Sequence, residues 1–435
     1  MNQLFKYGEI LNEGYKKYRI LNFLGSGNQG EVYKVAYEGK EYALKWYFKS
    51  MATKEQKENL IKLINIGAPD NRFLWPIKFI ENSKKTGFGY IMPLRTSRYR
   101  NISDMMTRKI EPSFSAVLTA CIELCDSFLK LHKMNLCYKD ISFGNIFFDP
   151  LRGDILICDN DNVVENGKKN GVLGTPRFMA PEVVIGRSQP NIKSDLFSLS
   201  ILLFYLLVMH HPLEGKKEST IRCFDLPAMT ELYGKNPIFI FDPINKTNRP
   251  DVNYHKNALV FWPIYPEKLK DQFIQTFTKG IRIPDYRVDE IKWRDVSIET
   301  KNSLLYCNCG AENFYDRKKY ILNNREIGKC WNCEAKIPQP ARIKIDNEVI
   351  MLNSNTKLFN HHLCSDKKYD FRNIAAEVNK HPLKEDIFGL KNKTNIIWEA
   401  KLPSGKNMQV YPGKNIAIQN GLKLSFGTKN GEIRI

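Results

Sequence analysis

The chain has 435 residues, a formal net charge of +19 and 43% hydrophobic residues. This length predicts two or three domains, and the composition excludes a chain that is disordered throughout. The charge implies attraction to an anionic partner without choosing among nucleotide, nucleic acid, lipid and acidic protein. The N-terminus has no secretory signal pattern, and the longest apolar run, 196–209, is shorter than the ~20 residues that cross a bilayer. We therefore expect a cytoplasmic protein without a membrane span.

The first motif is a set of three glycines: Gly25, Gly27 and Gly30. Glycines at this spacing let the backbone of a hairpin approach phosphates with its amide groups. A dinucleotide-binding fingerprint has the same spacing but requires a helix after the glycines, whereas 31–36 alternates like a strand. The hairpin is therefore favoured, and Lys45, in the strand expected over 42–46, is placed to pair with α and β phosphates.

Two elements follow before the central motif. The apolar spacing predicts an amphipathic helix over 53–64 with its cap at Thr53. The segment 88–94 reads as a strand that runs into a hinge. Pro93 in this hinge has no N–H, but its carbonyl can accept a hydrogen bond from an adenine amine.

The central motif is Asp140 followed five positions later by Asn145 on a predicted loop. In phosphoryl transfer such an Asp accepts the proton of the attacking hydroxyl, and such an Asn holds Mg²⁺. An Asp and an Asn that cap a turn give the same pattern. An apolar strand, 155–158, then delivers Asp159 fourteen residues after Asn145, where a second metal ligand is required.

The segment 174–182 reads Gly-Thr-Pro-Arg-Phe-Met-Ala-Pro-Glu, and Ser194-Asp195 opens a buried helix. With these motifs in this order, the chain from about residue 18 to 295 resembles a eukaryotic-type (Hanks-type) protein kinase. The resemblance implies an α+β bilobal fold with a β-rich N-terminal lobe and a helical C-terminal lobe. Its Gly-Thr-Pro is more similar to Ser/Thr kinases than to Tyr kinases.

The resemblance implies transfer of the γ-phosphoryl group of Mg-ATP to Ser and Thr hydroxyls of proteins. Asp140 would be the catalytic base, Lys45 would hold the phosphates, and Asn145 and Asp159 would bind Mg²⁺. The nucleotide contacts it implies are Gly25, Ser26, Gly27, Gly30, Val32, Lys45, Met92 and Leu94.

The resemblance also implies scaffolding contacts. Glu182 would pair with Arg287, and Asp195 would brace the catalytic loop from the buried helix. An active kinase further offers a Glu from the helix over 53–64 to Lys45. The candidates that stay open at this position are Glu55, Glu58 and Gln56. Gln56 would place an amide where a carboxylate is expected.

Several positions depart from the family pattern. Tyr138-Lys139 stands where His-Arg is usual, and Ser142 replaces a Lys whose loss removes several kcal/mol of transition-state stabilisation unless another cation compensates. Asn160-Asp161 replaces Phe-Gly. Because 160–174 contains no Ser, Thr or Tyr, we expect activity to be constitutive or set by a partner rather than by phosphorylation there.

Two other functions have similar motifs. Small-molecule kinases of the aminoglycoside and choline type share the Asp and Asn pattern, but they lack the Ala-Pro-Glu segment and the Ser-Asp helix. A catalytically weak or inactive pseudokinase scaffold would bind nucleotide and partner proteins without phosphate transfer. The sequence names neither the substrate nor the activating signal.

Two close cysteine pairs follow the kinase-like region: Cys307 and Cys309, then Cys330 and Cys333. They resemble a zinc ribbon, in which four thiolates hold a structural Zn²⁺ without an open position. The first pair is one residue shorter than the usual C-x-x-C and so departs from the ribbon pattern. The segment 301–345 lacks a dense Arg and aromatic stripe, so contact with protein is favoured over contact with nucleic acid.

Residues 346–435 contain short alternating segments separated by turns, which predicts a small β-sandwich or barrel. This region is similar to forkhead-associated domains, and the whole arrangement resembles bacterial signalling kinases. The phosphopeptide signature of those domains is absent, so no ligand residues are assigned. His361, His362 and Cys364 have the residue types of a metal site, but an exposed polar cluster is favoured.

The expected organisation is therefore an N-terminal extension (1–17), a kinase domain (18–298), a Cys₄ zinc ribbon (299–345) and a C-terminal β-sandwich-like module (346–435). The cofactors expected from it are ATP, Mg²⁺ and structural Zn²⁺. The partners expected are a protein substrate and a regulatory protein.

Overall fold

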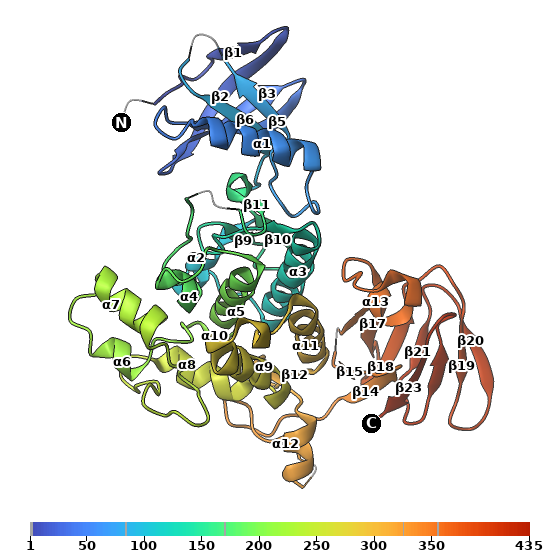
Figure 1. Cartoon of the computed structure of the whole chain (residues 1–435). Helices are drawn as coiled ribbons and strands as arrows, with labels where there is room; N and C mark the ends of the chain where they lie inside the picture. The colour runs from blue at the N-terminus through green and yellow to red at the C-terminus, as the bar shows by residue number, and fades with distance from the viewer. Residues whose placement is uncertain (1–2, 83–84, 169–170, 325, 355) are drawn as a thin grey trace. The chain divides into compact units, whose positions relative to one another are not determined.

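The computed structural model describes residues 3–82, 85–168, 171–324, 326–354 and 356–435. The chain forms two compact units (Figure 1): an N-terminal unit of residues 1–263 and 270–295, and a C-terminal unit of residues 264–269 and 296–435. Residues 169–170, in the segment predicted to lack phosphorylation sites, lie outside the described residues. Within the described residues, no helix is both long and apolar enough to cross a bilayer.

The N-terminal unit begins with a six-stranded sheet. In spatial order its strands are β1 (Ile10–Glu13), β2 (Lys16–Ser26), β3 (Gly30–Tyr37), β4 (Lys40–Tyr47), β6 (Phe88–Pro93) and β5 (Lys78–Glu81). The predicted helix is α1 (Lys54–Ile66), and the Thr53 side chain caps it by accepting a hydrogen bond from Gln56 N. Leu60 and Leu63 of α1 are buried, and the Trp75 indole donates to Leu63 O at 2.9 Å. These contacts fix α1 beside the sheet (Figure 1).

The rest of this unit is mainly helical. Its helices, together with those that lead into the C-terminal unit, are α2 (Ile102–Met106), α3 (Phe114–Lys133), α4 (Pro181–Val184), α5 (Ile192–Val208), α6 (Lys216–Ser219), α7 (Leu226–Thr230), α8 (Lys256–Phe261), α9 (Glu267–Phe277), α10 (Lys279–Arg282) and α11 (Glu290–Asn302). Helix α5 is the predicted buried helix, and all its residues from Ser194 to Val208 are buried. A β-rich part followed by a helical part is the bilobal arrangement that the sequence predicts.

Small sheets carry the loops of the site. One sheet has the order β10 (Ile155–Ile157), β9 (Ile146–Phe148) and β7 (Arg100–Asn101), and the other pairs β8 (Leu136–Cys137) with β11 (Val164–Glu165). Strands β9 and β10 are antiparallel, with Ile146 opposite Ile157. The residues just before β9 and just after β10 therefore lie side by side.

The C-terminal unit contains the cysteine pairs and two larger sheets. Around the cysteines lie β12 (Leu304–Tyr306), β13 (Glu312–Phe314) and α12 (Arg317–Leu322). The first larger sheet has the order β15 (Glu348–Leu352), β14 (Ala341–Ile345), β23 (Asn430–Arg434), β22 (Lys423–Ser425), β19 (Trp398–Lys401) and β20 (Asn407–Val410). The second has the order β16 (Lys357–Phe359), β17 (Ile374–His381), β18 (Lys384–Asn392) and β21 (Asn415–Ala417), and α13 (Asn360–Leu363) follows β16.

One apolar core holds these two sheets together. Ile343 and Ile433 of the first sheet and Val378 and Leu390 of the second are each fully buried in the same cluster, beside Trp398. Two sheets that share one core form a β-sandwich, as the alternating segments predict.

Candidate active site

The glycine loop is the turn of the β2–β3 hairpin, as the strand-like segment after it predicts. Gly27 N donates to Gly30 O at 2.9 Å, which closes the loop. A Cβ at Gly30 would lie 2.1 Å from Trp46 O, so only glycine fits against β4 there. At Gly25 and Gly27 a Cβ would meet no heavy atom within 4 Å. The space beside these two glycines is therefore open to a ligand.

Lys45 lies on β4 with its side chain only 6% exposed. Its Nζ donates to Gln29 Oε1 at 2.9 Å, Asp159 Oδ1 at 2.8 Å and Asp161 Oδ2 at 2.8 Å. Burial by itself lowers the pKa of Lys45, but Asp161 and Asp159 outweigh it and raise this pKa. The lysine is thus charged and held between the glycine loop and the segment that follows β10.

Asp140 and Asn145 come together on the loop between β8 and β9. Asn145 Nδ2 donates to Asp140 O at 2.8 Å and to Asp140 Oδ2 at 3.1 Å, while Thr175 Oγ1 donates to Asp140 Oδ1 at 2.8 Å. The amide nitrogen of Asn145 faces Asp140, so its oxygen faces away and is placed to ligate a cation. Asp140 remains half-buried, with both carboxylate oxygens oriented by neutral donors.

Asp159 follows β10, and the pairing of β10 with β9 brings it beside Asn145. Cys158 N donates to Asn145 O at 2.8 Å. Asp159 has a left-handed backbone (φ 53°, ψ 39°), which is uncommon for a residue other than glycine and is typical of functional sites. Burial raises the pKa of Asp159, Lys45 opposes this, and Asp161 raises it further, so the net shift is upward. A cation between Asn145 and Asp159 would relieve this accumulation of negative charge.

The predicted nucleotide-contacting side chains lie in one apolar cluster beneath the glycine loop. Met92 is buried in it, and Val32 and Leu94 are partly buried against it. Cys158 and Leu156 of the opposite side join the same cluster. Partly exposed apolar side chains on two sides are suited to the faces of an adenine ring. Ser26 pairs in the ladder with Glu31 at the start of the glycine loop.

The predicted brace from α5 is present. Asp195 Oδ2 accepts from Tyr138 N at 2.6 Å, and Asp195 Oδ1 accepts from Lys139 N at 2.9 Å. His132 on α3 contacts the same carboxylate through Nε2 at 3.2 Å and contacts Glu290 through Nδ1. Burial lowers the pKa of His132, but the two carboxylates raise it to about 9 overall. The loop that carries Asp140 and Asn145 is therefore anchored to a charged, buried cluster.

The predicted ion pair between Glu182 and Arg287 is also confirmed. The two guanidinium nitrogens of Arg287 lie 2.8 and 2.7 Å from the two Glu182 oxygens, and the Arg287 side chain is fully buried. Arg287 also donates to Gly280 O and Lys193 O. The pair ties the Ala-Pro-Glu segment to the residues before α11.

The departures from the family pattern have structural counterparts. Tyr138 is buried and its hydroxyl donates to Cys158 O, which joins the catalytic loop to the strand that carries Asp159. Lys139 Nζ donates to Lys168 O at 2.7 Å. Lys139 therefore holds the segment after Asp159 through a backbone carbonyl. Ser142 is buried within the loop.

The helix position left open by the sequence is occupied by Gln56. Its Nε2 donates to the Tyr47 hydroxyl at 2.9 Å and to Asp161 O at 3.2 Å, while Glu55 and Glu58 are exposed. The carboxylate that joins Lys45 beside Asp159 is instead Asp161. Sequence reasoning missed this role of Asp161 and those of Gln29 and Thr175. An acidic residue where the family has glycine was the available signal.

The four clustered cysteines converge in the C-terminal unit. The sulfurs of Cys307 and Cys333 are 3.6 Å apart, those of Cys309 and Cys330 are 3.8 Å apart, and all four lie within 4.8 Å of one another. Four sulfurs on a tetrahedron around zinc, with Zn–S bonds of ~2.3 Å, would be roughly 3.8 Å apart. The shortened first pair therefore does not prevent a Cys₄ site. Burial raises the pKa of Cys330, but nearby N–H donors lower it to about 6, which favours the thiolate.

The expectation of an exposed cluster at His361 and His362 is wrong, since both are buried. They lie near Glu348 with metal-site spacing. However, His361 Nδ1 accepts from Tyr369 N and His362 Nδ1 accepts from Phe359 N, both at 2.9 Å. Each ring therefore carries a proton on Nε2, which leaves no lone pair there for a metal. The histidines are buried because they join α13 to its neighbours through hydrogen bonds.

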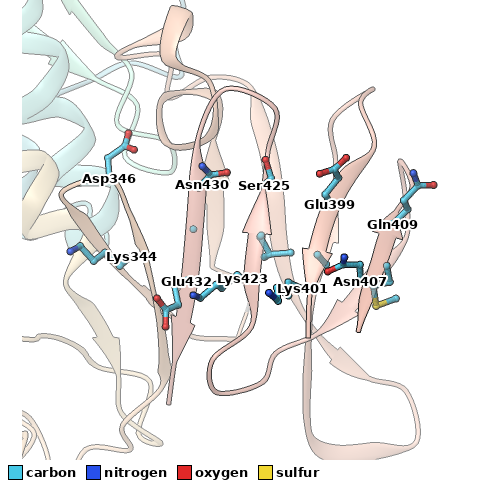
Figure 2. A pocket seen from close by; sticks show the side chains of 14 residues that line it. Lys344, Asp346, Glu399, Lys401, Asn407, Gln409, Lys423, Ser425, Asn430 and Glu432 are labelled. Carbon is cyan, nitrogen blue, oxygen red and sulfur yellow. The ribbon is translucent and has the colours of Figure 1, made fainter. Parts of the chain in front are cut away.

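A hollow of about 840 Å³ lies on the outer face of the six-stranded sheet of the sandwich (Figure 2). Its charged lining residues are Lys344, Lys401, Lys423, Asp346, Glu399 and Glu432. Figure 2 shows the labelled side chains in two rows across the strands. The three lysines and Glu432 lie in one row, and Asp346 and Glu399 lie in the other. The two signs balance, so the hollow lacks the net positive charge that would favour a phosphate group.

The comparisons with known proteins agree with this geometry. The family described as protein kinase domain matches residues 18–259, which is more than half of the chain. The chain therefore belongs to the protein kinase family.

Curated relatives include several Ser/Thr protein kinases. A cell cycle serine/threonine-protein kinase of Saccharomyces cerevisiae is 24% identical over 271 residues, covering 58% of this chain and 38% of the relative. Serine/threonine-protein kinase 4 homolog B of Dictyostelium discoideum is 26% identical and covers 54% of this chain and 21% of the relative. Serine/threonine-protein kinase 10 of Danio rerio is 26% identical and covers 45% and 21%, respectively. The chain thus spans less than two fifths of the length of these relatives.

Proposed function

We propose that the chain is a Ser/Thr protein kinase that transfers the γ-phosphoryl group of Mg-ATP to protein hydroxyls. One observation carries this proposal: Lys45, Asp140, Asn145 and Asp159, from three separate segments, converge on one site beneath the glycine loop. The Ser/Thr kinases among its relatives support the same reaction.

Each residue has a role that its contacts support. Thr175 and Asn145 orient the carboxylate of Asp140, which accepts the proton of the attacking hydroxyl. Lys45 binds the α and β phosphates, and the amides of the glycine loop cover them. Asn145 and Asp159 would hold Mg²⁺, which supplies positive charge for the phosphate oxygens.

The segment after Asp159 supports activity without phosphorylation there. Glu165 on β11 accepts from Lys62 of α1 at 2.7 Å, and Asn166 N donates to Asn135 O at 2.9 Å. With the bond from Lys139 to Lys168 O, these contacts hold the segment with groups already present. We therefore expect constitutive activity or control by a partner protein. A functionally required phosphosite between Asp159 and Gly174, detected by mass spectrometry, would contradict this.

A phosphotransfer assay tests the proposed activity. Purified protein is incubated with Mg-ATP and offered itself, general protein substrates and small alcohols. We expect transfer to protein, with a loss of about a thousandfold in Asp140→Asn, because the base is removed and positioning alone remains. Asp154→Asn is the matched control, since Asp154 pairs with Arg98 outside the site. Nucleotide binding without any transfer by the wild type would instead favour the scaffold, and transfer only to alcohols would favour a small-molecule kinase.

We also propose that Cys307, Cys309, Cys330 and Cys333 form a zinc ribbon with one structural Zn²⁺, which the spacing of their sulfurs supports. Elemental analysis of the purified chain should find one zinc per molecule. Cys330→Ser should lose it, whereas Cys223→Ser, which removes an exposed cysteine elsewhere, should retain it. Retention of zinc by Cys330→Ser would exclude this site.

The remaining expectations also stay proposals. The sandwich, whose first strand β14 pairs with its last strand β23, is suited to a forkhead-associated-like module that recruits a regulatory protein. Its balanced lining charges favour a protein surface over a phosphorylated ligand. Ten free cysteines, all within the described residues, support a reducing, cytoplasmic location. We also propose a kinase of bacterial signalling type, because the order of a kinase domain, a proposed zinc ribbon and a proposed β module along the chain resembles that of such kinases.

A further inference from the structure

The ion-pair partners of Lys45 are distributed unusually. Its ammonium group contacts two carboxylates, Asp159 and Asp161, and both come from the segment that follows β10. Helix α1 contributes no carboxylate to it among the described contacts. Glu58 faces Lys54 at 3.9 Å, and Glu55 is exposed. The acidic partner that the family takes from this helix is therefore supplied from another element.

The two carboxylates are not equivalent. The Asp159 side chain is 39% exposed and gives Lys45 only Oδ1, whereas the Asp161 side chain is 0% exposed and gives both oxygens, at 3.1 and 2.8 Å. The Tyr47 hydroxyl also donates to Asp161 Oδ2. Asp159 is therefore free to exchange Lys45 for a metal ion, while Asp161 stays with the lysine.

Helix α1 supports the backbone at Asp161 instead of the lysine. Gln56 Nε2 donates to Asp161 O at 3.2 Å, and Asn59 Nδ2 donates to Asp161 O at 3.1 Å and to Val163 O at 3.0 Å. The side-chain amides of Gln56 and Asn59 are suited to this contact because the carbonyl oxygen of Asp161 accepts hydrogen bonds and needs N–H donors. A glutamate at position 56 would place a carboxylate against the same carbonyl and repel it.

The glycine loop is coupled to the same turn. Gln29 accepts from Lys45 through Oε1 and donates from Nε2 to Asn162 Oδ1 at 3.0 Å. Residues 160–162 form a single 3₁₀ turn. This turn thus holds a buried carboxylate toward Lys45 and an amide oxygen toward the glycine loop.

We propose that Asp161 is the positioning residue for Lys45, so that the short turn after Asp159, and not helix α1, sets the orientation of the phosphate-binding lysine. This inference rests on the proposed kinase function for its effect on turnover. Its reason is electrostatic: when Asp159 turns to a metal ion, Lys45 keeps one fixed, buried counter-charge and does not follow Asp159. Lys45 is then oriented for phosphate binding when residues 160–162 are ordered. A movement of helix α1 is not required for this.

Asp161→Asn tests the role, because it keeps the shape and removes the charge. Misplacement of a positioned group by ~1 Å costs about a hundredfold in rate, so we expect kcat to fall by that factor. Lys45 keeps its positive charge in this variant while one negative charge near the phosphates is lost. Binding of ADP in EDTA, without metal, should therefore become at least about threefold tighter, even though Lys45 is misaligned for phosphoryl transfer. If Asp161 had only a structural role, Asp161→Asn would lower kcat and also weaken ADP binding. That result would overturn the proposal, and so would an unchanged kcat together with unchanged ADP binding.

Two further variants separate Asp161 from its neighbours. Glu55→Gln combined with Glu58→Gln removes both exposed helix carboxylates and should leave kcat and ADP binding within twofold of the wild type. A large loss in this variant would assign the role to the helix and overturn the proposal even if Asp161→Asn fails to fold. Asp154→Asn is the matched control for the same change of side chain, since Asp154 pairs with Arg98 and not with Lys45.

A failure of the inference about Asp161 can be distinguished from a failure of the proposed kinase function. If the wild type transfers no phosphate, the kinase proposal fails, but metal-free ADP binding still reports on the charge beside Lys45. Tighter binding in Asp161→Asn, with unchanged binding in the helix variant, would support the pairing. The opposite pattern would refute it.

Discussion

Protonation of His132 makes the free energy of unfolding depend on pH. Its ring lies between Asp195 and Glu290 with only 6% of the side chain exposed. Burial opposes the charge on the ring, but the two carboxylates raise the pKa of His132 from 6.5 to about 9. Because the folded pKa is raised, the protonated ring stabilises the fold fully below pH 6.5, and this contribution disappears as the pH rises to about 9.

The magnitude follows from the shift. Each pKa unit corresponds to 1.36 kcal/mol, so the rise of about two and a half units is worth about 3 kcal/mol. His132→Gln removes the charge at every pH. The difference in free energy of unfolding between wild type and variant should therefore be largest near pH 6 and shrink by about 3 kcal/mol toward pH 9.

Urea unfolding followed by hydrogen exchange in peptides from α3 and α5 measures this quantity for the N-terminal unit. His211→Gln is the control, because burial lowers the pKa of His211 to about 4 and the ring is neutral throughout the window. The difference in free energy of unfolding between wild type and His211→Gln should stay constant above pH 6.5. A difference for His132→Gln that does not vary with pH would refute a charged His132 between the two carboxylates.

Three other perturbations follow from the contacts. Gly30→Ala should destabilise the N-terminal unit by about 1–3 kcal/mol, because its Cβ would lie 2.1 Å from Trp46 O, whereas Gly27→Ala should change thermal stability little. Equal effects of the two variants in thermal unfolding would contradict the close approach of Gly30 to Trp46. Arg287→Ala should cost about 3–5 kcal/mol in urea unfolding by leaving Glu182 without its partner, and a loss below 1 kcal/mol would show that the pair is not needed. Zinc removal by a chelator should lower the melting temperature of the C-terminal unit and leave ADP binding unchanged, and an unchanged melting temperature would contradict a structural metal.

Much of the site can be predicted from the sequence because its motifs are local. The spacing of Asp140 and Asn145 lies within one loop, and the apolar strand before Asp159 sets where that residue emerges. The alternation after Gly30 separates a hairpin from a dinucleotide fold, since strand and helix periodicities differ. The same period of two predicts the sandwich, where Ile343 and Val378 face a common core.

The carboxylate partners of Lys45 could not be chosen in this way, because they depend on contacts between segments more than a hundred residues apart. Glu55, Glu58 and Gln56 lie within one turn of a helix, so only its packing shows that Gln56 faces the site and both glutamates face solvent. The buried histidines of α13 are a second case. The positions of their ring protons follow from neighbours that the fold brings to them, and no local pattern contains that information.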